Sequence, residues 1–131
     1  MGPLNLLLDT CAFLWLALPQ GKLSAEATRL INLRSTNLFM SDVSVWEICL
    51  KHSNGKLKLP GAPRQWLPSR MAFFQAQSLA ISQDSIIRGG ELAHQHADQF
   101  DRLLAAQAIE SGMTILSPDM PLSLLGASRI W

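Results

Sequence analysis

Four of the ten acidic residues stand inside or directly after apolar segments. Asp9 follows the apolar run 4–8, and Asp119 lies just beyond the run 113–116. The carboxyl ends of parallel strands meet at one edge of a sheet, where open α/β folds gather their ligands. We therefore expect Asp9 and Asp119 to lie on the same edge.

The other two acids, Glu47 and Asp101, belong to expected helices, and Asp98 stands beside Asp101. Glu47 lies inside the apolar segment 43–50, too far from its start to cap a helix, so we expect a buried carboxylate that needs a partner. Asp98 and Asp101 open the helix expected over 100–112. In an alternating α/β fold the start of that helix faces the same edge as the strand ends.

Each acid also has an ordinary structural interpretation when it is taken alone. Asp98 suits the N-cap of its helix, and Asp101 suits the first turn, where negative charge favours the helix dipole; each is worth about 0.5–1 kcal/mol. Glu47 stands one turn before Lys51, and such an ion pair contributes about 0.3–0.5 kcal/mol. The two strand-end acids can be loop residues. None of these interpretations explains why the acids converge.

Carboxylates that converge repel one another and raise one another's pKa unless a cation compensates them. Mg²⁺ and Mn²⁺ prefer oxygen ligands and are commonly held by a few carboxylates together with the phosphate oxygens of a substrate. Zinc is not expected, because His94 and His96 have no Cys or His partner at ligand spacing. The acids therefore predict a site for Mg²⁺ or Mn²⁺.

Alternating strands and helices position these acids. The expected strands are short apolar runs that end in polar residues, at 4–8, 37–40, 78–81, 113–116 and 129–131. The expected helices are 12–18 with Thr10 as its cap, 24–33, 43–53, one beginning after Pro63, 82–90 and 100–112. This alternation favours an α/β fold with a mainly parallel sheet.

The composition excludes several classes of protein. The chain has 131 residues, 48% of them hydrophobic and 16% charged, which predicts a single domain over 1–131 and excludes disorder. No apolar run is long enough for a membrane span, and no export signal is present, so we expect a cytoplasmic protein. Cys11 and Cys49 are expected to be reduced and buried. Whether Met1–Pro3 is native stays open.

Four ordered segments carry a resemblance to a known family. They read LLLDTCAFLW at 6–15, SVWEI at 44–48 with GKLKL at 55–59, HADQFDRLLAAQA at 96–108, and ILSPD at 115–119. With these segments the chain resembles the PIN-domain ribonucleases, in particular the VapC-type toxins of bacterial toxin–antitoxin modules. The resemblance spans nearly the whole chain, down to the closing Ile130-Trp131.

The resemblance implies a PIN-like three-layer α/β/α sandwich and a Mg²⁺-dependent (or Mn²⁺-dependent) endoribonuclease that acts as a toxin. It implies that the metal-binding and catalytic residues are Asp9, Glu47, Asp101 and Asp119. Asp98, Ser117 and Thr10 are then expected around these ligands. Gln99 and Ser117 stand where relatives commonly have proline and threonine, and neither change removes a ligand.

RNA can approach four acids only if positive charge offsets them. The expected RNA contacts are Lys51, Lys56, Lys58 and Arg102, and a solvated surface stays open as the alternative for each. Trp15 and Trp46 are expected to pack in the core rather than to stack on bases.

The resemblance also implies a cognate antitoxin protein that covers the active site. Apolar residues of the first two helices, among them Phe13, Trp15 and Leu30, exceed what a small core absorbs and predict a homodimer or a groove for that antitoxin. Two other functions stay open. One is a catalytically inactive PIN-like binding protein; the other is a receiver-like phosphoacceptor module, which also places aspartates and Mg²⁺ at strand ends.

Overall fold

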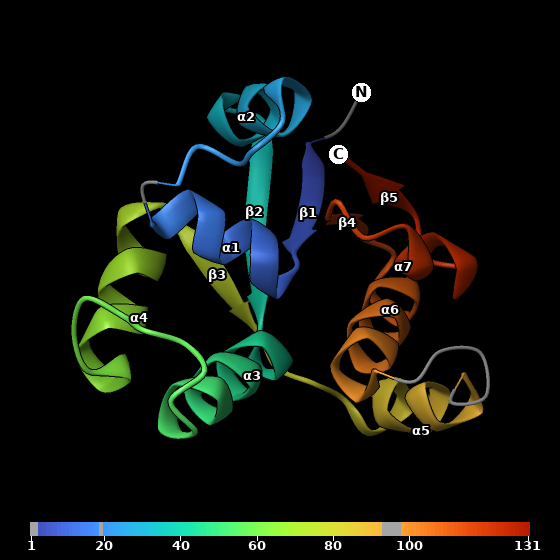
Figure 1. Ribbon diagram of the computed structural model, residues 1–131. Helices are drawn as coiled ribbons and strands as arrows, with labels where there is room; N and C mark the ends of the chain where they lie inside the picture. Colours follow the sequence, from blue (N-terminus) through green and yellow to red (C-terminus); the bar gives the residue numbers. More distant parts are fainter. Residues whose placement is uncertain (1–2, 19, 93–97) are drawn as a thin grey trace.

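A computed structural model describes residues 3–18, 20–92 and 98–131, and Figure 1 shows a central sheet with helices on both of its faces. The sequence predictions that involve Met1, His94, His96 and Ala97 concern residues outside the described ranges. Within these ranges no helix has the length and apolar character needed to cross a membrane.

The sheet has five strands in the order β3-β2-β1-β4-β5, and all neighbouring strands are parallel. Its strands are β1 (Leu4–Leu8), β2 (Thr36–Ser41), β3 (Ala76–Leu79), β4 (Thr114–Leu116) and β5 (Arg129–Ile130). Leu8 pairs with Met40 on one side and Leu116 on the other, so the carboxyl ends of the central strands meet at one edge. The expected parallel α/β sheet is confirmed. Its order differs from the 2-1-3-4-5 order of receiver-type folds, so the receiver-like alternative is wrong.

The described helices are α1 (Thr10–Ala17), α2 (Ala25–Asn32), α3 (Asp42–Ser53), α4 (Pro63–Phe73), α5 (Gln83–Glu91), α6 (Gln99–Ser111) and α7 (Met120–Leu124). Ser24, Ser41 and Ser82 cap α2, α3 and α5, because each hydroxyl accepts a hydrogen bond from a backbone N–H in the first turn. These starts agree with the sequence prediction to within about two residues.

Three local predictions were wrong. Asp9, not Thr10, caps α1: its Oδ1 accepts from the Ala12 N–H at 2.6 Å, and Thr10 is already helical. β3 begins two residues earlier than expected, because Gln75 in a left-handed turn (φ 56°) ends α4 and the next residue already pairs with β2. α7 was not predicted, since its Pro121 resembles a helix breaker but stands in the first turn, where proline is tolerated.

The alternation of side chains along β1 divides the core in two. Leu6 and Leu8 pack with Phe13, Leu30 and other residues of the layer formed by α1, α2 and α4. Leu7 packs on the opposite face with residues of α6 and α7. Figure 1 shows these two groups of helices on opposite sides of the sheet. The result is the three-layer α/β/α sandwich that was expected.

Two predictions about apolar residues also need correction. Phe13 and Leu30 are buried in the core, because they pack in one cluster with residues of β1, β2 and α4 and do not form the surplus apolar surface that was predicted. Exposed large apolar side chains are instead found mainly on other elements, at Trp46, Leu50, Phe73, Ile86, Ile87, Met120 and Leu124. Cys11 was expected to be buried and is exposed, since it lies on the outer face of α1; Cys49 is half-buried.

Candidate active site

Asp9 and Asp119 lie on one edge of the sheet, as expected, and Ser117 links them. β1 ends at Leu8 and β4 at Leu116, and these two residues are paired, so the residues that follow them are neighbours. The Ser117 hydroxyl donates to Asp9 Oδ2 at 2.5 Å and accepts from the Asp119 N–H at 2.9 Å. Ser117 is completely buried. One hydroxyl therefore orients two acids that are 110 residues apart in the chain.

Glu47 approaches the same edge from α3 and is buried, as predicted, with 7% of its surface exposed. The Thr10 hydroxyl lies 2.6 Å from Glu47 Oε1 and 3.0 Å from Ser44 Oγ. Lys51 Nζ lies 2.5 Å from Glu47 Oε2, which is the ion pair that the sequence left open. Burial of the carboxylate is thus compensated by a hydroxyl and an ammonium group.

The start of α6 contributes two more acids. Asp98 is the N-cap residue: its Oδ1 accepts from the N–H groups of Phe100 and Asp101, which confirms the capping prediction. Asp101 lies in the first turn and is half-buried. Asp119 likewise precedes α7, but its carboxylate makes no capping hydrogen bond there. Capping therefore accounts for Asp98 and not for Asp119.

These side chains line one small cavity of about 150 Å³. Its lining residues are Asp9, Thr10, Cys11, Glu47, Lys51, Asp98, Asp101, Leu104 and Asp119. All four acids predicted as ligands are in this set, with Asp98 and Thr10. Of the predicted RNA contacts only Lys51 lines the cavity. Lys56 and Lys58 are exposed beyond α3, and Arg102 is half-buried and absent from the lining.

The charges in the cavity act on one another. The pKa of Asp9 is raised to about 6, chiefly because burial disfavours its charged form, and the hydrogen bonds from Ser117 and Ala12 oppose this. The negative charges of Asp101 and Asp119 raise the pKa of Asp9 further. The pKa of Lys51 is raised, mainly by its hydrogen bond to Glu47. The acids are therefore close enough to repel, as the sequence predicted.

The donor set suits a hard divalent cation, because the cavity offers mainly carboxylate oxygens. As the side chains stand, no three His, Cys, Asp or Glu residues in the described part of the chain are close enough to hold one ion. Glu47 is paired with Lys51, whereas each oxygen of Asp9 accepts one hydrogen bond and keeps a further lone pair. Asp9 therefore keeps lone pairs for a cation, and in this arrangement waters or rotated side chains would have to complete the shell around it.

Several residues around the cavity were not predicted. Cys11 and Leu104 line it, and Ser44 contacts Thr10. The helical spacing of Ser44 and Glu47, three residues apart on α3, is a signal that could have placed Ser44 beside the site. Trp46 is 48% exposed and Trp15 is half-buried against Trp131, so the core positions predicted for both tryptophans were wrong.

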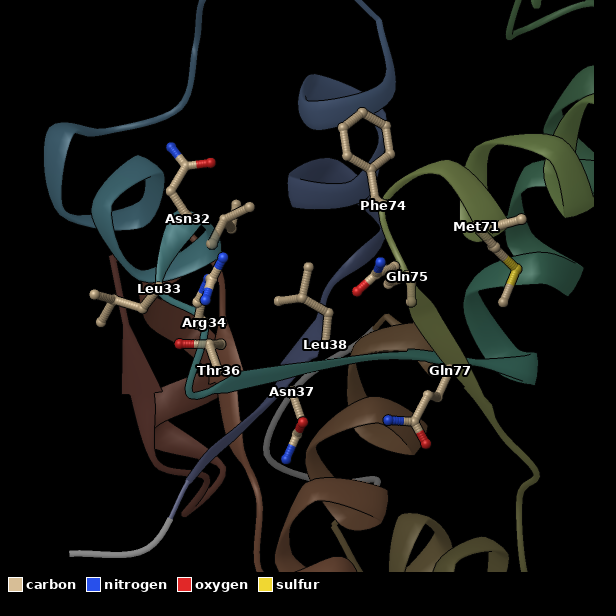
Figure 2. Close-up of a pocket in the computed structure, with 13 residues that line it drawn as sticks. Asn32, Leu33, Arg34, Thr36, Asn37, Leu38, Met71, Phe74, Gln75 and Gln77 are labelled. Atoms are coloured by element: carbon tan, nitrogen blue, oxygen red, sulfur yellow. The ribbon is translucent and has the colours of Figure 1, made fainter.

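A larger cavity lies elsewhere and has a different character. It measures about 660 Å³ and lies where α2 and α4 end and β2 and β3 begin, at the opposite edge of the sheet (Figure 2). Among the described residues that line it Arg34 is the one that carries a charge, and amides such as Asn37 and Gln75 add polar groups. A cavity without carboxylates cannot supply the ligand chemistry found at the acidic edge.

The acidic cavity lies at the carboxyl edge of a parallel sheet. It defines a class of α/β protein in which clustered carboxylates need a cation to compensate their negative charge. Residues 6–123 match the family model of the PIN domain. The chain belongs to the PIN domain family, whose members are typically nucleases that use divalent metal ions. A search among curated proteins found no match to the sequence.

Solved structures with the same fold are distant in sequence. The VapBC2 complex of Rickettsia felis, bound to a promoter DNA fragment, matches with a TM-score of 0.73 and 14% identity over 98% of this chain and 99% of that chain. VapBC-1 from nontypeable Haemophilus influenzae gives a TM-score of 0.68 and 14% identity, with 97% of each chain covered. FitAcB from Neisseria gonorrhoeae gives a TM-score of 0.67 and 16% identity, with 96% of each chain covered. At these identities the likeness establishes the fold.

Proposed function

We propose that this protein is a metal-dependent endoribonuclease that hydrolyses RNA phosphodiester bonds with Mg²⁺ or Mn²⁺. The observation that carries the proposal is the convergence of acids from the ends of β1 and β4, from α3 and from the start of α6 on one cavity of about 150 Å³. Such a cluster disfavours folding unless a cation compensates it. Membership of the PIN domain family supports the same reaction class.

Asp9, Asp101 and Asp119 are the proposed metal ligands, and Glu47 acts either as a ligand or through water. A bound Mg²⁺ ion supplies an activated water and neutralises charge that develops on the phosphate. Ser117 fixes the Asp9 carboxylate, and Thr10 fixes that of Glu47, through buried hydrogen bonds. Because these hydroxyls are held in place before substrate binds, little reorganisation is needed during the reaction.

Lys51 is the proposed contact for the scissile phosphate, because it is the one cation among the described residues that line the cavity and its side chain is 47% exposed. In the structure it is paired with Glu47 and remains partly open to solvent. Lys56 and Lys58, exposed beyond the end of α3, are proposed to contact RNA away from the cleaved bond, as is Arg102.

We propose further that the protein is the toxin of a toxin–antitoxin pair in the cytoplasm. Structures with the same fold include VapBC complexes and FitAcB, which makes a cognate antitoxin the partner to seek. A homodimer is proposed through α3 and α5, where an apolar cavity of about 300 Å³ lies between Trp46 and Ile86, both about half exposed. Apolar surface of this kind is typical of protein interfaces.

The test compares wild type with Asp101→Asn on fluorescent RNA, with Mg²⁺, with Mn²⁺ and with EDTA. Asp101 is suited because, unlike Asp9, it does not cap a helix. We expect cleavage by wild type with either metal, none with EDTA, and a loss of at least about 100-fold in the variant. Asp84→Asn, an exposed acid in the first turn of α5, is the matched control and is expected to behave as wild type.

The same comparison separates the enzyme from the inactive alternative. Wild type that binds an antitoxin or RNA tightly and cleaves no RNA with either metal would establish a catalytically inactive PIN-like binding protein. Equal cleavage by wild type and Asp101→Asn, with unchanged thermal stability, would disprove the assignment of the site.

A further inference from the structure

Arg129, in the short last strand β5, makes three side-chain contacts on the acidic edge. Its Nη1 donates to the backbone carbonyl of Ser117 at 2.8 Å, and its Nε donates to Ser123 Oγ at 2.9 Å. Its Nη2 contacts Met120 Sδ. One guanidinium group therefore joins Ser117, which follows β4, to the first residue and the last turn of α7, and Asp119 lies between the points that it contacts.

The segment that Arg129 holds is the one on which two proposed ligands depend. The Ser117 hydroxyl donates a hydrogen bond to the Asp9 carboxylate and accepts one from the Asp119 N–H. The Ser117 backbone carbonyl accepts a hydrogen bond from Arg129. Asp119 itself is exposed and has no capping hydrogen bond to fix it. Its orientation is therefore set by Ser117 and by the clamp of Arg129 on either side of it.

The sheet beside this segment ends in a short strand. β5 has two residues, and β4 and β5 are joined by backbone bonds such as Ile115 N–H to Ser128 O and Ser117 N–H to Ile130 O. The Arg129 contacts given above are to neutral atoms, so the guanidinium charge is not consumed by an ion pair there.

We propose that Arg129 is a positioning residue: it orients Ser117 and Asp119, and through them the carboxylates that bind the metal. The proposal rests on the proposed nuclease function. Arg129 touches no reacting atom, and it acts through the loop between β4 and α7. Removal of a residue that orients metal ligands typically lowers metal affinity or activity by about 10- to 100-fold.

The first experiment measures amide hydrogen exchange by NMR in Arg129→Met, Arg129→Lys and wild type without metal. We expect exchange at the Asp119 amide at least about 10-fold faster in Arg129→Met, with the Ile115 amide, which bonds Ser128, unchanged. Arg129→Lys can keep a single hydrogen-bond donor, so its exchange rate at the Asp119 amide is expected to lie between those of wild type and Arg129→Met. Equal protection at Asp119 in all three proteins, or an equal loss at Asp119 and Ile115 because β5 detaches, would overturn the proposal.

The second experiment measures Mn²⁺ affinity by electron paramagnetic resonance and then RNA cleavage. We expect about 10-fold weaker Mn²⁺ binding and a lower kcat with nearly unchanged KM in Arg129→Met, and partial recovery in Arg129→Lys. Arg88→Met is the matched control, because Arg88 also loses a side-chain bond, to Glu110, away from the acidic cavity. Wild-type Mn²⁺ affinity in Arg129→Met would overturn the proposal. Wild type that cleaves no RNA would refute the nuclease, and the amide and Mn²⁺ results would then decide on Arg129.

Discussion

Replacement of Asp9 by asparagine is predicted to stabilise the metal-free protein at neutral pH. Burial raises the pKa of Asp9 from 3.8 to about 6, so the charged carboxylate disfavours the folded state by about 3 kcal/mol above pH 7. Asparagine keeps the N-cap hydrogen bond to Ala12 but cannot accept from Ser117 with a second oxygen, a loss of about 1 kcal/mol. The expected net gain is about 2 kcal/mol.

The difference in stability between wild type and Asp9→Asn is expected to change sign with pH. The folded pKa of Asp9 lies above the unfolded value, so the stabilisation by the protonated acid is complete below about pH 4 and is lost as the pH rises through about 6. Wild type and Asp9→Asn are compared by urea unfolding in EDTA from pH 4 to pH 8. The variant is expected to be the less stable protein near pH 4 and the more stable one near pH 7.

Added Mg²⁺ should narrow the difference at pH 7, because it stabilises a folded wild type whose Asp9 carboxylate it compensates and acts less on the variant. Asp84→Asn, at an exposed position, should follow wild type at every pH. A variant that is no more stable than wild type at pH 7, or a difference that does not change between pH 4 and pH 8, would refute the reasoning about buried charge.

Three further predictions concern single contacts. Lys51→Met should lower the free energy of unfolding by about 1 kcal/mol in urea, because Glu47 keeps its burial and loses its ammonium partner; an unchanged value would contradict this. Gly112→Ala should cost about 1 kcal/mol, or about 3–5 °C in Tm, because Gly112 ends α6 at φ 66° although nothing crowds it. Cys11 is an exposed residue, but its thiol is partly desolvated beside the acidic cavity, and this desolvation and the nearby carboxylates raise its pKa to about 11. It should therefore react with a disulfide reagent at pH 8 about 10-fold more slowly than an ordinary thiol; this is measured on a Cys49→Ser background, and a rate equal to that of a free thiol would count against it.

Much of the fold follows from local features of the sequence. Apolar runs that end in a polar residue identified β1, β2 and β4, and serines before apolar periodic segments identified the starts of α2, α3 and α5. The predictions that were wrong depended on non-local terms. β3 takes its register from pairing with β2. α7 has a proline in its first turn, and the residue type alone does not show whether a proline begins a helix or breaks one.

The candidate site shows the same division. Burial of Glu47 could be predicted because its neighbours in the helix are apolar, and Asp98 could be identified as a cap because it directly precedes α6. The exposure of Cys11 could not, since it depends on which face of α1 packs against α4. The role proposed for Arg129 also had no local signal, because its contacts exist only when β5 joins β4.

The sequence by itself determined which carboxylates stand at strand ends and helix starts, because hydrophobic periodicity and capping act over a few residues. The pairing of Glu47 with Lys51 was also open to prediction, because the two residues lie one turn apart on α3. Tertiary structure alone decided that Ser117 lies between Asp9 and Asp119 and that Thr10 reaches Glu47. These hydrogen bonds depend on distances of a few ångströms between segments far apart in the chain, and only the packed sheet sets those distances.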